Sequence, residues 1–211
     1  PYQPAESRLN ITRSIIEVMA EFKHPFSIIT KSDLIKRDLD ILAPLAAQNL
    51  CSVAVSVTTL DNGLKRILEP RAPAAKTRLD TIRALSQSGI NVTMLVAPII
   101  PYINDHELES ILEAGCENGA TYARYILLRL PLEISEMFQA WLRAHFPDRA
   151  NKVMNIIRQS RGGKDNQSQF FERMRGTGEF ANMLRQRHDI RCRKLGLNPS
   201  SSSASSSSSN P

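Results

Sequence analysis

Polar side chains and prolines gather in five short segments at or near the ends of predicted β-strands. These segments are 1–6 (PYQPAE), 29–32 (ITKS), 56–61 (SVTTLD), 69–73 (EPRAP) and 96–99 (VAPI). A barrel places its active site at the carboxyl ends of its strands, so these segments are candidates for a ligand site. Alternatively, Lys31 is a solvated strand-end lysine and Ser56 a hydrogen-bonded core hydroxyl.

Other reactive side chains are too scattered to form a site of known type. The cysteines, Cys51, Cys116 and Cys192, are 65 and 76 residues apart, which fits no zinc or iron–sulfur spacing, so we expect no metal site. Cys51 and Cys116 are expected to be buried small hydrophobic residues. Cys192 lies among basic residues, which could lower its thiol pKa, but a plain position on a helix surface is favoured. The sequence contains no P-loop, G-x-S-x-G elbow or G-x-G-x-x-G motif.

Apolar periodicity predicts alternating helices and strands up to about residue 146. Strands are expected over 26–30, 51–58, 91–97 and 122–130, and helices over 5–22, 32–50, 73–88, 104–118 and 135–146. Pro44 predicts a kink or break in the second helix, Asn104 with Glu107 resembles a capping box, and residues 59–72 are expected to form a loop. Because strands separated by helices need crossover connections, the fold class is α/β, with a parallel sheet or barrel and the helices outside.

The predicted strand at 51–58 has two different faces. Val53, Val55 and Val57 share the face that suits packing against helices, whereas the opposite face carries only Ala54, Ser56 and Thr58. A filled barrel would prefer bulky branched residues on its inner face. Small, partly polar residues there suit an interior that leaves room for a ligand. A packed core with a few satisfied hydroxyls is the alternative.

Composition limits the class of protein. The chain has 211 residues, 42% of them hydrophobic and 23% charged, which is typical of one globular domain with a small appendage. No apolar run approaches the ~20 residues that a membrane span needs. An odd number of widely spaced cysteines argues against a disulfide framework, so a cytoplasmic setting without membrane contact is expected.

Charge divides the chain into three parts. Residues 1–146 carry 15 basic and 16 acidic residues, whereas residues 147–197 carry 12 basic and 5 acidic residues. We expect a (β/α) domain over 1–146 and a basic helical extension over 147–197 with a Gly-Gly break at 162–163. The Ser-rich tail over 198–211 has no charge and little apolar surface to bury, which predicts disorder.

The order and spacing of the five polar segments resemble those in the later part of a radical S-adenosylmethionine (SAM) protein, of the group related to spore photoproduct lyase. The matching motifs are the YQPAE, TKS, S-x-T, EP-x-AP and API sequences at 2–6, 30–32, 56–58, 69–73 and 97–99. The resemblance extends over about residues 1–130. In addition, the segment at 162–178 resembles a C-terminal extension of one subgroup.

This resemblance implies a partial (β/α) radical SAM barrel, made of its later parallel strands, and a lyase-like enzyme. Such enzymes hold a [4Fe–4S] cluster on three cysteines and reductively cleave SAM to a 5′-deoxyadenosyl radical, with an electron donor such as flavodoxin or ferredoxin. By the resemblance, Lys31 and Ser56 contact SAM, and the backbone of Ala97 meets its adenine side. The substrate is unknown, and nucleic acid is one candidate.

The chain departs from the family pattern in one respect. It lacks the C-x-x-x-C-x-x-C segment that holds the cluster. We therefore expect a C-terminal portion of a longer enzyme, inactive by itself. An alternative is a non-catalytic module that binds nucleic acid or protein through its basic C-terminal helices. A phosphate-binding barrel without iron chemistry is a third hypothesis, disfavoured because no Gly-rich phosphate loop follows the late strands.

Overall fold

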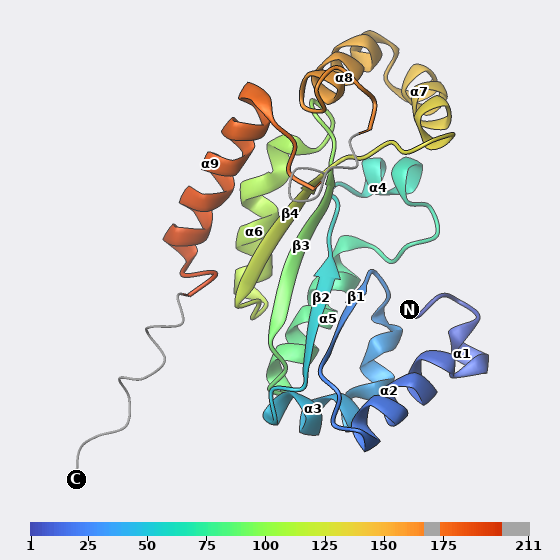
Figure 1. The fold of residues 1–211 in the computed structure, drawn as a ribbon, viewed down its shortest axis with the longest axis vertical. Coiled ribbons are helices and arrows are strands. Elements are labelled where there is room, and N and C mark those ends of the chain that lie inside the picture. Colours follow the sequence, from blue (N-terminus) through green and yellow to red (C-terminus); the bar gives the residue numbers. More distant parts are fainter. Residues whose placement is uncertain (167–173, 200–211) are drawn as a thin grey trace.

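A computed structural model describes residues 1–166 and 174–199 (Figure 1). The helices are α1 (Glu6–Leu9), α2 (Ile11–Glu21), α3 (Leu39–Ala47), α4 (Asn62–Leu68), α5 (Ala75–Gln87), α6 (Leu108–Glu117), α7 (Ile134–His145), α8 (Pro147–Gln159) and α9 (Gly178–Leu195). The strands are β1 (Phe26–Thr30), β2 (Cys51–Ser56), β3 (Val92–Ile99) and β4 (Tyr122–Leu127), and two 3₁₀ helices span Asp33–Asp38 and Asp105–Glu107. The alternation predicted from apolar periodicity is confirmed.

The four strands form one parallel sheet in the order β1-β2-β3-β4. Helices connect them, as parallel neighbours require. The α/β fold class with a helical C-terminal part is therefore confirmed. In Figure 1 the sheet lies at the centre, with α1 and α2 on the side of β1 and with α9 beyond β4.

The two faces of β2 behave as the sequence predicts. Val53, Val55 and Val57 are almost fully buried among the helices and belong to the larger hydrophobic core. On the opposite face, Ala54 is half-buried, and Ser56 borders a cavity. Helices α3, α5, α6 and α9 pack on the strands. A second, smaller core lies between α7 and α8, where the predicted boundary at residue 146 also falls.

Local predictions about helices were partly wrong. The helix predicted over 5–22 is broken at Asn10, which adopts the left-handed conformation between α1 and α2. Of the kink or break predicted at Pro44, the break does not occur, since α3 continues through this residue to Ala47. The predicted loop over 59–72 contains α4, whose first turn is capped by Asp61 through its carboxylate and the Gly63 amide, 2.6 Å apart.

The two edges of the sheet differ. Along β4, the Asn198 side chain accepts from the Ala123 amide at 2.9 Å and donates to the Ala123 carbonyl at 3.1 Å, and the Leu127 amide donates to the Met174 carbonyl. Within the described residues no strand pairs with the outer edge of β1. Nearby, α2 exposes a stripe of apolar side chains that the core does not use: Ile11, Ile15 and Val18, continued by Phe22.

The C-terminal part is helical, as predicted. Gly176 and Gly178 both have positive φ angles and form the turn that leads into α9. Much of the family-like segment at 162–178 and most of the Ser-rich tail fall within 167–173 and 200–211, outside the described residues. Among the residues that are described, no helix has both the length and the apolar character needed to span a membrane.

Candidate functional site

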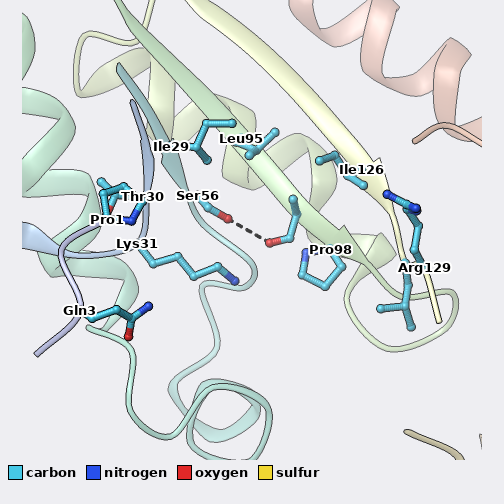
Figure 2. Close-up of a pocket in the computed structure, with 12 residues that line it drawn as sticks. Pro1, Gln3, Ile29, Thr30, Lys31, Ser56, Leu95, Pro98, Ile126 and Arg129 are labelled. Atoms are coloured by element: carbon cyan, nitrogen blue, oxygen red, sulfur yellow. Dashed lines mark hydrogen bonds between the residues drawn. The ribbon is translucent and has the colours of Figure 1, made fainter. Parts of the chain in front are cut away.

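A cavity of about 520 Å³ opens on the sheet face that the helices leave uncovered (Figure 2). Each strand contributes to its wall near the carboxyl end: Lys31 follows β1, Ser56 ends β2, Ala97 and Pro98 lie in β3, and Arg129 follows β4. Figure 2 shows the Lys31 side chain extending along the cavity, with Arg129 on the opposite wall. Its volume is typical of sites for small molecules and cofactors.

The three residues singled out in the sequence meet at this cavity. Lys31, Ser56 and Ala97 all line it, although they lie on three different strands. The Ser56 hydroxyl donates to the Ala97 carbonyl at 3.0 Å. This bond joins the ends of β2 and β3. Ser56 is buried, at 3% exposure, as the alternative of a hydrogen-bonded core hydroxyl expects, and its lone pairs face a ligand only at the cavity wall. Their assignment as SAM contacts stays a prediction.

Lys31 carries its charge into a polar cluster. Its ammonium group contacts the Glu69 carboxylate and lies 3.3 Å from the Thr58 hydroxyl. A lysine ammonium has three donor hydrogens, so one remains for a ligand after these two contacts. The side chain is 36% exposed and thus accessible from the cavity.

Glu69 connects Lys31 to a deeply buried arginine. Its second oxygen accepts from Arg78 Nη2 at 2.6 Å, and the Arg78 side chain is only 2% exposed. Arg78 also donates to the carbonyls of Ser56 and Pro73, at 3.0 and 2.8 Å. Burial of the Glu69 carboxyl acts to raise its pKa, but the Lys31 and Arg78 contacts outweigh it, so the pKa lies below its usual value. Glu69 therefore ties its loop to α5 through the ion pair with Arg78.

Two residues that brace the site were misassigned from the sequence. Asn104 does not cap a helix but donates from its amide to the carbonyls of Thr58 and Pro98, at 2.7 and 2.9 Å. Glu107 accepts from the Thr59 hydroxyl at 2.5 Å. The predicted capping box was wrong because these side chains satisfy the loop after β2 instead of the helix amides. Both residues fix the ends of β2 and β3 at the cavity.

The N-terminal segment contributes only partly. Gln3 lines the cavity, as does Pro1. Tyr2, between these two residues, is buried at 3% exposure, and its hydroxyl donates to Asp38 at 2.8 Å. Burial and this bond to a carboxylate raise the pKa of the Tyr2 hydroxyl. Tyr2 therefore anchors the segment and leaves Gln3 at the cavity.

The cysteines do not fit an iron–sulfur cluster. Across the described ranges, no three cysteine, histidine or acidic side chains lie together as metal ligands. Cys51 and Cys192 are buried, and Cys116 is partly buried. The expectation that Cys192 lies on a helix surface was wrong, because this side of α9 packs on the core. Burial, with a smaller effect of Asp189, raises the pKa of the Cys192 thiol to about 11.

The basic residues of α9 are largely engaged within the fold. Arg187 forms a two-pronged pair with Glu109, with nitrogen–oxygen distances of 2.7 and 2.6 Å. Arg191 pairs with Glu113, also on α6. These pairs neutralise part of the face that the binding-module alternative would use. Binding of nucleic acid or protein through the C-terminal helices stays a prediction that no contact here favours.

The fold and the cavity define part of a parallel βα barrel with a ligand site at the carboxyl ends of its strands. The Radical SAM superfamily matches residues 5–115, just over half of the chain, so the chain belongs to the radical SAM superfamily. Membership supports a radical SAM enzyme in general, and it implies SAM and a [4Fe–4S] cluster for the superfamily as a whole.

Individual relatives agree with this assignment. An uncharacterized protein of Mycobacterium tuberculosis is 33% identical over 160 residues, covering 75% of this chain and 47% of its own length. One of Methanocaldococcus jannaschii is 28% identical over 154 residues, with 73% and 56% covered. The chain thus spans about half the length of these relatives.

Solved structures show the same fold. Spore photoproduct lyase complexed with dinucleoside spore photoproduct superimposes with a TM-score of 0.61 at 14% identity, over 89% of this chain and 55% of the lyase chain. At this identity the likeness concerns the fold alone. The partial radical SAM barrel expected from the sequence motifs is confirmed.

Proposed function

We propose that this chain forms the SAM-binding part of a radical SAM enzyme. The observation that carries the proposal is the convergence of Lys31, Ser56 and Ala97 on one cavity at the strand ends. A lysine ammonium suits the carboxylate of SAM, and the Ser56 hydroxyl can accept from a ligand hydroxyl or amino group. The Ala97 carbonyl already accepts from Ser56 and Thr58, so the backbone there contributes a surface for the adenine.

Each residue has a definite task in this proposal. The free donor hydrogen of Lys31 binds the SAM carboxylate, and Glu69 with Thr58 holds the ammonium at the cavity. Ser56 accepts a hydrogen bond from the ligand while its own hydrogen stays on the Ala97 carbonyl. The backbone at Ala97 borders the adenine side of the ligand. Arg78 and Asn104 keep these strand ends in place through their bonds to backbone carbonyls.

Within residues 1–166 and 174–199, no group of side chains is placed to hold the cluster. In radical SAM enzymes, the cluster delivers the electron that cleaves SAM, received from a donor such as flavodoxin or ferredoxin. We therefore assign binding, and not cleavage, to this chain, and we expect the isolated 211 residues to be catalytically inactive. The substrate of the whole enzyme is unknown.

The binding step is tested by titrating the 211-residue chain with SAM in a calorimeter. Lys31→Met removes one charge-assisted hydrogen bond, worth about 1.5–3 kcal/mol, so the affinity should fall about tenfold or more. Lys36→Met is the matched control. Lys36, like Lys31, follows β1 in the sequence, but its ion pair in the described structure is with the exposed Asp33. Equal SAM affinity for wild type and Lys31→Met would contradict the proposal, as would no SAM binding by wild type.

The catalytic step is tested on a longer polypeptide that includes the reading frame upstream of Pro1. A C-x-x-x-C-x-x-C segment there, followed by anaerobic reconstitution and release of 5′-deoxyadenosine from SAM, is the expected result. A reconstituted protein that binds a cluster but releases no 5′-deoxyadenosine would refute the catalytic part of the proposal.

A further inference from the structure

A second cavity of about 790 Å³ lies along the same open sheet face. It shares three wall residues, Ile29, Leu95 and Ile126, with the cavity at Lys31. Because the shared residues come from β1, β3 and β4, the two cavities adjoin across the sheet, and the second extends past the edge of β4 to α9. Together they form one groove, which we call the sheet groove, with an apolar floor between its two ends.

Arg124 lies in this groove at the level of the proposed SAM contacts. In the sheet register, Ser56 is opposite Leu95, and Leu95 is opposite Arg124. Neighbouring strands lie about 4.8 Å apart, so the backbones at Ser56 and Arg124 are separated by roughly 10 Å. A molecule bound beside Arg124 is therefore adjacent to a ligand at Ser56.

Three arginines face the sheet groove without a carboxylate partner. Arg129 lines the first cavity, and Arg124 and Arg175 line the second. Among the residues that the structure describes, none of the three takes part in an ion pair. By contrast, the arginines on the helix-covered side, such as Arg78 and Arg187, are paired with glutamates. The groove thus carries positive charge that the fold itself does not neutralise.

Arg129 shows this lack of a partner most clearly. Among the described residues, its buried Nε atom has no hydrogen-bond partner, and its Nη1 atom lies 4.0 Å from the Met174 sulfur. A buried guanidinium nitrogen without an acceptor is unfavourable unless a ligand completes it. Figure 2 places this side chain across the cavity from Lys31. The arrangement leaves room for an acceptor between the two positive groups.

We propose that the sheet groove binds an anionic substrate whose phosphate or carboxylate groups contact Arg124, Arg129 or Arg175. This inference rests on the proposed function, because it places the substrate next to the SAM site. The planar guanidinium forms two parallel bonds to either kind of oxyanion, which a lysine does not. The apolar floor of Ile29, Leu95 and Ile126 contacts the uncharged body of the substrate.

The far end of the groove also fits this arrangement. Asp189 is the acidic residue among its described lining, and it is paired with His188 at 2.9 Å. The His188 ring in turn lies against the Tyr125 ring, with centroids 5.0 Å apart. Along the described lining of the groove, the positive charges of Lys31 and the three arginines therefore exceed this one negative charge.

The test is a titration of the 211-residue chain with inorganic phosphate and with succinate at low ionic strength, followed by nuclear magnetic resonance shifts of the arginine side chains. Arg124→Gln and Arg129→Gln should each weaken binding about tenfold, because each removes a charge-assisted contact. Arg83→Gln is the matched control, since it removes the same charge from the exposed side of α5, on the other face of the sheet. Circular dichroism checks that each variant is folded.

The outcomes separate this inference from the proposed function. Binding of either anion that is lost in Arg124→Gln and Arg129→Gln but kept in Arg83→Gln and Lys31→Met supports the groove, and the preferred anion identifies the group. Absence of binding to wild type, or equal binding by all variants, overturns it. SAM titrations of the same variants are read separately: Arg124→Gln should keep SAM affinity, whereas Lys31→Met should lose it.

Discussion

Replacing Glu69 tests whether the charge cluster behind the cavity stabilises the fold as well as orienting Lys31. Glu69 is the carboxylate that both Lys31 and Arg78 contact. In Glu69→Ala the Arg78 guanidinium, 2% exposed, stays buried with its charge uncompensated, apart from bonds to two backbone carbonyls. We therefore expect a large loss of stability from a single substitution outside the hydrophobic core.

The magnitude follows from the burial of the partners. Removing one partner of a buried ion pair costs about 3–5 kcal/mol. Because Lys31 is partly exposed and can be solvated, the lower end applies, about 3 kcal/mol for Glu69→Ala. Glu69→Gln keeps the side-chain shape and a hydrogen-bond acceptor, so its cost should be about 1–2 kcal/mol.

The dependence on pH has a defined sign. The pKa of Glu69 is lowered in the folded protein, whereas an unfolded chain has the ordinary glutamate value of about 4.3. Above about pH 5 the carboxylate is ionised in both states and its contribution is complete. As the pH falls below 4.3, the unfolded state takes up a proton first, so the contribution shrinks and disappears below the folded pKa.

The assay is urea unfolding of wild type, Glu69→Gln and Glu69→Ala at several pH values between 7 and 3.5. The stability gap between wild type and Glu69→Gln should be constant from pH 7 to 5 and narrow below it. Glu17→Gln is the control, because Glu17 is an exposed partner of Arg13 and should leave the midpoint unchanged. A gap that is absent at pH 7, or that widens in acid, would refute the reasoning.

Two further predictions concern packing and thiol chemistry. In Gly115→Ala the new methyl group would lie 2.4 Å from Cε and 3.1 Å from Cβ of Met94. Overpacking costs about 1–3 kcal/mol and outweighs the helix-propensity gain of about 1 kcal/mol, so urea unfolding should show a net loss of stability. An increase in stability would contradict the close contact. Under native conditions a colorimetric thiol reagent should modify the partly exposed Cys116 first. Cys51 and Cys192 are buried, and burial raises the pKa of both thiols, so they should react only after unfolding. Equal reaction rates for all three cysteines would contradict this difference in burial.

The sheet could be predicted because its strands carry their own signals. The valines of β2 and the short apolar run of β1 have strand propensity, and the helices between them make a parallel arrangement necessary. Helix α4 was missed because Asn62 and Gly63 at its start favour turns in isolation. Its stability comes from the Asp61 cap and from burying Leu64, and burial in tertiary contacts cannot be read from local propensity.

The candidate site, like the sheet, could be predicted only in part from the sequence. Parallel strands bring their carboxyl ends to one edge, so Lys31, Ser56 and Ala97 could be expected together. The partners of Asn104 could not, because its bonds join loops that are distant in sequence. Arg124 and Arg129 were missed because the sequence does not show which face of the sheet is left uncovered by helices. Without that knowledge, a basic residue in or after a strand cannot be assigned to a ligand site.

The unequal edges of the sheet limit how molecules of this kind can associate. Exposed strand edges usually threaten open-ended polymer growth, because each added strand offers a fresh edge to the next. In the described part of the chain, Met174 and Asn198 occupy hydrogen-bonding groups of β4, which leaves β1 as the accessible edge. Two copies of the 211-residue chain paired through β1 would each bury the accessible edge of the described sheet. Pairing through β1 alone would therefore give a dimer instead of a growing fibre.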